Sequence, residues 1–566
     1  MRSVLRALRV FAALLPAACA PAWKRTPHDE RFQHAITPPA HARPRRESLP
    51  GDWWDRGRSS TIVPLGRVIS PAAWARNLGW RRAALDVNAW DEVPDSTWFE
   101  NRIGRREMSP EEIERGPGSG TGPALGKLLI ISGKLEGATP GLIIRDAAGV
   151  TWFVKFDKAQ YREMATGAEV VAQRLMHAAG YLVPDMQIVD LQLSRLVLAP
   201  DAMRNDEYGS LVPLTRRDLA ELLINLNPTP TGRIRALFSK QLEGDPIGPF
   251  GYRGVRIDDP NDRIPHERRR SLRGLWVFSA WLNNTDVRRQ NTLDTFIAVG
   301  PRKDRGYVRH FLIDFGDSLG SAGERGKFIG EGYEGAVEWP AVIGRLFGVG
   351  LRYPYWVTVR RTREPAVGVF EAKIFDPARW EPRFPNPAFD EATPRDTYWA
   401  AAILAHFDRA RVAAAVGAAR YGRAEAGALV LDVLMKRRDK LLRHAFRRMA
   451  PLGDPDVRGW RVAMRDLEEL AGLAGPSPVY RVEVRWNRTG AADVVLERGA
   501  LQRPAIDLAR AAARARALPG FGDDPFLTVS WTRPRGGRIG PAVELHLRVA
   551  RDRVVPVGLE RQVAQR

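Results

Sequence analysis

The segment WLNNTDVRRQN, residues 281–291, contains an aspartate and an asparagine whose spacing suits phosphate chemistry. Asn291 follows Asp286 by five positions, and both stand between an apolar helical stretch and the start of a strand. Phosphoryl transfer needs a carboxylate that orients or deprotonates the attacking hydroxyl, and oxygen ligands for a magnesium ion. The spacing alone is weak evidence, because an Asx-rich turn that caps a hairpin has the same composition.

A second carboxylate ends the next apolar strand. In LIDFGDSLG, residues 312–320, the apolar run finishes at Asp314, which Phe315 and Gly316 follow. A carboxylate at the end of a strand can bind a metal that bridges nucleotide phosphates; the alternative is a simple strand-ending turn. The apolar runs on either side of the polar turn at 300–306 predict a hairpin, so we expect Asp314 to return beside Asn291.

A lysine lies within a third apolar strand, WFVKFD at 152–157. Lys155 needs a counter-charge if this strand is half buried, because an unpaired buried charge is costly. The amphipathic helix expected over 164–179, stopped by Gly180, offers Glu169, and Glu163 comes just before it. Nucleotide phosphates would supply another counter-charge. The alternative is a side chain that extends from an edge strand to water.

The order of these motifs resembles that of the protein-kinase-like superfamily, over roughly residues 125–350. Within it, NNTDVRRQN (283–291) resembles the catalytic loop of the HipA-type atypical kinases. The stretch AEVVAQRLMHAAGYLVP (168–184) resembles their helix that ends in Ala-Gly and Val-Pro. The sequence departs from that pattern at Arg288, where the HipA-type loop has His, and in the longer chain before Asp314.

The resemblance implies a role for each of these residues, together with ATP or another nucleoside triphosphate and Mg²⁺ or Mn²⁺ as cofactors. The implied roles are catalytic base for Asp286, metal ligand for Asn291 and Asp314, phosphate contact for Lys155, and partner of that lysine for Glu169, with Glu163 in reserve. There is no full G-x-G-x-x-G motif. Gly137 and Gly141, in GKLEGATPG at 133–141, are the candidates for a turn that covers the phosphates.

The resemblance also implies an α+β fold whose core is a two-lobed kinase-like domain. A small β-rich lobe is expected before a larger helical lobe, in which Thr393, Pro394 and Asp396 predict the start of a helix. Strands alternate again near the C-terminus, which indicates a small α+β module. We divide the chain into a signal peptide (1–20), a flexible tether (21–50), an irregular N-terminal wrap (51–122), the small lobe (123–212), the large lobe (213–450) and the C-terminal module (475–562).

The N-terminus has the pattern of a secretory signal: arginines at positions 2, 6 and 9, a short apolar run, then small residues. It resembles a bacterial lipoprotein signal, in which Cys19 is lipidated, although Pro16 stands where Leu is usual. The alternative is cleavage after Ala20 without lipid. No other stretch reaches the roughly 18 uncharged apolar residues of a membrane span. We therefore expect an exported cell-envelope protein, lipid-anchored or else periplasmic or secreted.

The chain has 566 residues and a formal net charge of +21, with arginines in every segment. Such a length predicts two or more domains, and the scattered arginines do not form the basic stripe that nucleic-acid binding needs. The histidines at 177, 266 and 310 show no zinc spacing. We read the tryptophans at 53, 54, 90 and 98 as packing anchors. Two functions remain open: a kinase with an unknown phosphate acceptor, or an inactive pseudokinase or envelope interaction lipoprotein.

Overall fold

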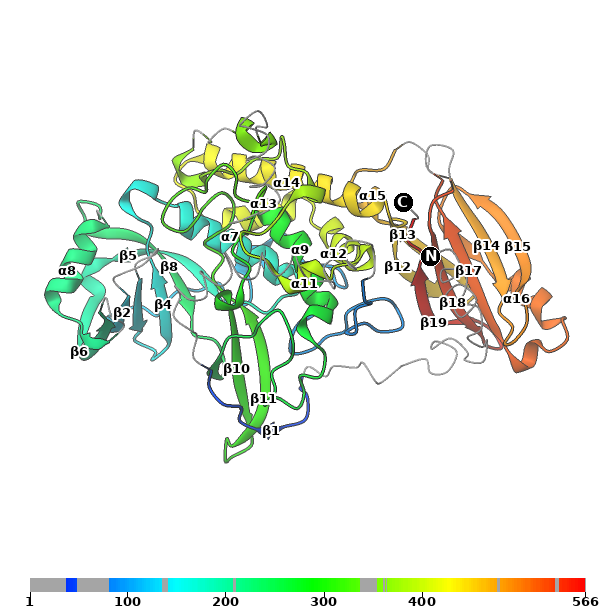
Figure 1. Cartoon of the computed structure of the whole chain (residues 1–566), viewed down its shortest axis with the longest axis horizontal. Coiled ribbons are helices and arrows are strands. Elements are labelled where there is room, and N and C mark those ends of the chain that lie inside the picture. The colour runs from blue at the N-terminus through cyan, green and yellow to red at the C-terminus, as the bar shows by residue number, and fades with distance from the viewer. Residues whose placement is uncertain are drawn as a thin grey trace, which may run out of the picture. The chain divides into compact units, whose positions relative to one another are not determined.

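The computed structural model describes residues 37–47, 81–134, 141–206, 210–226, 228–335, 354–359, 362, 364–475, 479–534 and 539–564, and every structural statement below concerns these residues. The predicted signal peptide with Cys19, most of the tether, and Gly137 lie outside them. The fold is a mixture of α-helices and β-sheets, which confirms the predicted α+β class (Figure 1).

The chain divides into two compact units. The described part of the first, here called the C-terminal unit, comprises Val87–Val93 and the chain from Phe446 onward. The second, here called the central unit, lies within His34–Asp86 and Pro94–Ala445. Among the described residues, no helix combines the length and the apolar character that a membrane crossing needs.

A seven-stranded sheet begins the central unit, in the order β5-β8-β4-β3-β2-β6-β7. Strands β2, β3 and β4 form an antiparallel meander, whereas β2 pairs with β6 in parallel. The strands are β2 (Leu128–Lys134), β3 (Gly141–Arg145), β4 (Thr151–Lys155), β5 (Met186–Gln192), β6 (Leu196–Asn205), β7 (Leu211–Pro213) and β8 (Arg233–Lys240). Strand β8 lies between β5 and β4, although it falls within residues 213–450, which were expected to form the larger helical lobe. The sheet therefore extends beyond position 212.

Helix α7 (Met164–Ala179) has the bounds that the sequence predicted. It contacts β5, β8 and α13 (Arg409–Gly417), and so it lies between the sheet and the helices (Figure 1). Gly180 ends it with φ +122°, and a Cβ there would collide with the ring of Phe99. The carboxylate of Asp157 accepts hydrogen bonds from the backbone N–H groups of Ala165 and Thr166, both at 3.0 Å, which satisfies donors that the first helical turn leaves open.

The hairpin that carries the predicted metal ligands is formed by β10 (Thr292–Val299) and β11 (Arg305–Leu312). They pair in antiparallel fashion with Thr292 opposite Leu312, as expected, and β1 (His41–Ala42) and β9 (Asp245–Gly248) complete this sheet. Helix α9 (Arg270–Leu282) precedes the hairpin and ends at Asn283, which has φ +51°. The buried ring of Trp98 stacks on His310 of β11 with centroids 3.6 Å apart, which confirms its role as a packing anchor.

Apart from α14, the remaining helices of the central unit are short and begin at polar caps. As predicted, Thr393 caps α12 (Pro394–Ala405): its side chain accepts a hydrogen bond from the backbone N–H of Asp396. The Asp396 carboxylate in turn accepts a hydrogen bond from the backbone N–H of Thr393. The others are α6 (Pro110–Arg115), α8 (Arg216–Asn225), α11 (Pro387–Asp390) and α14 (Ala424–Phe446).

The C-terminal unit has a five-stranded antiparallel sheet, in the order β15-β14-β17-β18-β19, and a three-stranded sheet, in the order β12-β13-β16. Apolar side chains from both sheets and from α16 form one core, against which Trp90 also packs. The elements are β12 (Leu452–Arg458), β13 (Arg461–Asp466), α15 (Leu467–Leu470), β14 (Tyr480–Trp486), β15 (Val494–Leu501), β16 (Ala505–Asp507), α16 (Ala509–Arg516), β17 (Phe526–Thr532), β18 (Ala542–Val549) and β19 (Val554–Arg561).

Candidate functional site

Lys155 is the last residue of β4, where Trp152 and Val154 point into the core of the sheet. Its Nζ lies 2.8 Å from Oε1 and 3.0 Å from Oε2 of Glu169, which projects from α7. The side chain of Glu169 is only 3% exposed, whereas that of Lys155 is 27% exposed. The ammonium group therefore connects a buried carboxylate to the solvent-facing side of the site.

Asp314 completes this cluster. Its Oδ1 lies 3.0 Å from Nζ of Lys155, and its side chain is 53% exposed. The residue has φ +58°, a left-handed conformation that is uncommon for a non-glycine residue and that is often found at functional sites. A Cβ on Gly316 would lie 3.5 Å from both Asp314 Oδ1 and Glu169 Oε2, so the two carboxylates flank this glycine closely.

The charges in this cluster shift one another's protonation. Burial lowers the pKa of Lys155, but the negative charges of Asp314 and Glu169 outweigh it, so the pKa is raised and the lysine is cationic. Burial raises the pKa of Glu169 to about 7; Lys155 opposes that shift, and the nearby Asp314 adds to it. The charge of Glu169 therefore changes near neutral pH.

Of the two glutamates that the sequence offered as partners of Lys155, the structure brings Glu169 to the lysine. Glu163 has φ +68°, and its carboxylate accepts a 2.8 Å hydrogen bond from the backbone N–H of Gly422. Gly141 lies in β3 directly opposite Lys155, where a Cβ would come within 2.6 Å of the carbonyl oxygen of Val154. The close approach of two strands accounts for this glycine without a ligand.

Asp286 and Asn291 are held together on the loop after α9. The Asn291 amide nitrogen donates to the backbone oxygen of Asp286 at 2.6 Å and to its Oδ2 at 3.1 Å. This leaves the amide oxygen of Asn291 as the atom that can ligate a cation. The other carboxylate oxygen of Asp286 lies 2.7 Å from Nε of Arg288, whose guanidinium stacks over the ring of Phe384.

The hairpin brings this loop beside the Asp314 cluster. The backbone N–H of Ile313 donates to the carbonyl oxygen of Asn291 at 3.0 Å, so Asp314 follows directly after a residue that is bonded to the predicted loop. Asp286, Asn291, Ile313 and Phe315 also line one small pocket. Asp314, which contacts Lys155, is thus joined to the loop of Asp286 and Asn291 through the backbone of the residue before it.

Sequence reasoning missed a second lysine at this site, and this one is buried. Lys327 forms an ion pair with Asp317 and donates to Thr285 Oγ1 at 2.5 Å. Burial lowers its pKa to about 8, against the opposing charges of Glu331 and Asp286. Lys327 therefore ties the loop around Asp286 to the chain that follows Asp314. Its segment, ERGKF, has no apolar periodicity that would have marked the lysine as buried.

A scan of protein-family models, a search of curated proteins and a search of solved structures each found no match to this chain. The site is therefore described only by the arrangement of its own side chains. It is an ammonium–carboxylate cluster at the end of a strand, joined through a hairpin to an Asp–Asn loop. Such an arrangement offers a cation for anionic oxygens and oxygen ligands for a hard metal ion.

Proposed function

We propose that the chain is a kinase-like protein that binds a nucleoside triphosphate with a divalent metal and transfers phosphate to an acceptor not yet identified. The observation that carries this proposal is the arrangement of two joined groups of side chains. Glu169 and Asp314 both contact Lys155. Asn291, which is bonded to Asp286, accepts a backbone hydrogen bond from the residue before Asp314. These residues come from four separate segments, and a turn that merely capped a hairpin would not need them together.

In this proposal the seven-stranded sheet and α7 form the small lobe, and the chain from α9 to α14 supplies the larger helical lobe. Support comes from α7, which contacts the sheet on one side and α13 on the other. Glu169 on that helix holds Lys155 at 2.8 Å, so the helix fixes the direction of the ammonium group. Nucleotide phosphates would meet this ammonium group on its exposed side.

The residues present fit a magnesium or manganese ion. Asp314 and the amide oxygen of Asn291 are oxygen ligands, which hard divalent cations prefer, and the amide nitrogen of Asn291 is already engaged by Asp286. A bound ion would neutralise phosphate charge during transfer. Asp286 would accept the proton of the attacking hydroxyl, and Arg288 and Asn291 orient its carboxylate.

A second candidate is an inactive relative that keeps this fold for interaction within the cell envelope. The contact that favours it is the ion pair between Arg288 and Asp286, at 2.7 Å, which occupies one oxygen of the proposed base. An ion-paired carboxylate is a weaker base than one that faces its substrate alone.

Nucleotide binding is tested by thermal unfolding of the full chain with and without Mg-ATP. At nucleotide concentrations of 100 times Kd, a ligand that binds only the folded state stabilises it by about 2.7 kcal/mol. We expect this gain in the wild type, and its loss in Asp314→Asn. Asp304→Asn, on the exposed turn between β10 and β11, is the matched control and should retain it.

Catalysis is tested by mass spectrometry after incubation with labelled ATP, looking for transfer to the protein itself or to lysate proteins. Asp286→Asn should bind nucleotide but reduce transfer by about 10²-fold or more. Nucleotide binding without transfer in the wild type would support the inactive relative. If nucleotide stabilises neither the wild type nor Asp304→Asn, the proposed kinase function is wrong.

We also propose that the protein is exported and anchored by lipid at Cys19. The support is the basic, apolar and small-residue pattern that precedes this cysteine. Mass spectrometry of the mature N-terminus should find a lipid-modified Cys19. A mature chain that begins after Ala20 would show secretion without an anchor.

A further inference from the structure

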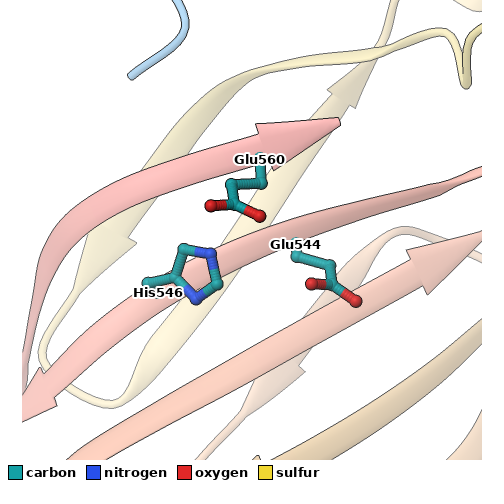
Figure 2. Close-up of side chains that lie close together, drawn as sticks. All are labelled: Glu544, His546 and Glu560. Carbon is teal, nitrogen blue, oxygen red and sulfur yellow. The ribbon is translucent and has the colours of Figure 1, made fainter. Parts of the chain in front are cut away.

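A cluster of side chains with metal-binding chemistry lies in the C-terminal unit, outside the site described above. It consists of Glu544 and His546 on β18 and Glu560 on β19 (Figure 2). One ligand atom from each lies within 4.8 Å of the others. It is the one group of three or more His, Cys, Asp or Glu side chains with such geometry in the part of the chain that the structure describes.

The sheet register places all three side chains on the same face. Glu544 and His546 are two positions apart on β18, and Glu560 is directly opposite Glu544 on β19. Carboxylates that face each other across antiparallel strands repel one another, because their Cβ atoms lie only about 5 Å apart. Gly558 is opposite His546, so no side chain of β19 competes for the space beside the imidazole.

Hydrogen bonds around His546 determine which of its nitrogens carries the proton. The amide nitrogen of Asn487 donates to Asp493 at 3.0 Å, which turns the amide oxygen towards Thr528. Thr528 therefore donates its hydroxyl proton to that oxygen, at 2.6 Å. In the 2.8 Å contact between Thr528 Oγ1 and His546 Nδ1, the imidazole must then be the donor.

A neutral imidazole that donates through Nδ1 presents a lone pair at Nε2. This is the arrangement found in metal-binding histidines, whose second nitrogen is held by a hydrogen bond to a neighbouring group. The chain from Asp493 through Asn487 and Thr528 thus prepares His546 to act as a ligand.

The carboxylates are disposed to complete such a site. Both described contacts of Glu544 go to its Oε1, from Arg485 at 2.7 Å and from Gln562 at 3.5 Å, which leaves Oε2 as the oxygen that can ligate a cation. Glu560 is exposed, whereas His546 is buried. Zinc ligands at about 2.1 Å from the metal lie roughly 3.4 Å apart. The long side chain of Glu560 can therefore close the remaining distance without movement of the strands.

We propose that Glu544, His546 and Glu560 bind a divalent transition-metal ion, Zn²⁺ in particular, at the surface of the C-terminal unit. One imidazole and two carboxylates carry a combined charge of −2, which balances the ion. Zinc commonly takes three such protein ligands and a water molecule in its fourth position. This site is separate from the proposed nucleotide site and does not depend on it.

The test is calorimetric titration of the full chain with ZnCl₂, after chelator treatment, in nucleotide-free buffer and without a histidine tag. The wild type should bind one Zn²⁺ at this site. Glu560→Gln should weaken binding by more than about 100-fold, because losing a ligand costs more than altering its outer partner. Glu497→Gln, on β15 of the same sheet, is the matched control and should bind as the wild type does.

Two further variants sharpen this test: the first separates a metal site from an ion pair between a protonated His546 and a glutamate, and the second separates the zinc site from the proposed nucleotide site. Thr528→Val removes the acceptor for Nδ1 and should weaken zinc binding by about 10-fold to 100-fold. Asp314→Asn, which changes the proposed nucleotide site, should leave zinc binding unchanged. The zinc proposal can therefore hold even if the kinase proposal fails. A wild type that takes up no Zn²⁺, or a Glu560→Gln variant that binds as tightly as the wild type, would overturn the proposal.

Discussion

The two clusters of charged side chains differ in the chemical nature of the group that accompanies their carboxylates. In the central unit, Glu169 and Asp314 share the ammonium group of Lys155, at 2.8 and 3.0 Å. In the C-terminal unit, Glu544 and Glu560 accompany the imidazole of His546. An ammonium group has only donors, whereas a neutral imidazole offers a lone pair.

This difference separates two ways in which a protein can neutralise neighbouring carboxylates. A carboxylate paired with lysine is neutralised by the protein itself, and the pair can hold a helix and a strand in position. Carboxylates beside an imidazole lone pair can take their counter-charge from a metal ion. Removing the ammonium group of Lys155 should therefore destabilise the folded central unit. Adding a metal ion should stabilise the folded C-terminal unit.

The largest effect should come from Lys155→Met. The substitution leaves Glu169 buried without its partner, and breaking a buried pair in this way costs about 3 kcal/mol. Lys158→Met is the control, because its ion pair with Glu324 at 2.5 Å is partly exposed and contributes at most about 1 kcal/mol. Chemical denaturation measures both. Equal losses in the two variants would show that Lys155 does not stabilise the buried carboxylate.

The second cluster should respond to addition of a cation. At zinc concentrations of 100 times Kd, the free energy of unfolding of the C-terminal unit should rise by about 2.7 kcal/mol. Lys155→Met should show the same gain, whereas Glu560→Gln should show none. Denaturation with and without ZnCl₂ checks this. A zinc effect that disappears in Lys155→Met would mean that zinc acts at the central unit instead.

The pH dependence of stability should distinguish the clusters further. The folded-state pKa of Glu169 is raised to about 7 from 4.5, so between these values the folded state binds more protons than the unfolded state. The contribution of Glu169 to the free energy of unfolding is thus largest below pH 4.5. It falls as the pH rises towards 7, by at most about 1.4 kcal/mol per pH unit.

Glu169→Gln should remove this slope, because an amide does not titrate. Unfolding experiments between pH 4.5 and 7 compare the variant with the wild type. Glu560→Gln serves as the control and should leave this contribution intact. Parallel curves for Glu169→Gln and the wild type would show that Glu169 does not titrate in this range.

The smallest effect concerns Arg485, which lies 2.7 Å from Glu544. Arg485→Gln should tighten zinc binding about threefold to fivefold, because a partly exposed ion pair contributes roughly 0.5–1 kcal/mol and competes with the metal for the carboxylate. Calorimetric titration measures the change. Weaker binding in this variant would show that Arg485 orients Glu544 more than it competes.

Much of the central unit was predictable because its signals are local. The helix over 164–179 has its stop at Gly180, the cap at Thr393 has its acidic partner three residues later, and a polar turn separates the strands of the β10–β11 hairpin. The pairing of Lys155 with Glu169 was also predictable, since a strand lysine needs a counter-charge and the next helix offers one.

The tertiary structure decided the features that depend on pairing between distant segments. The sequence pattern did not place β8 between β5 and β4, because its strand partners are separated from it by other elements. Lys327 is buried only because Thr285 and Asp317 converge on it from two loops. The Glu544–His546–Glu560 cluster depends on the register of β18 and β19, which shifts after His546. A change of one residue in that register would turn Glu560 to the other face, so the composition of the strands alone could not reveal the cluster.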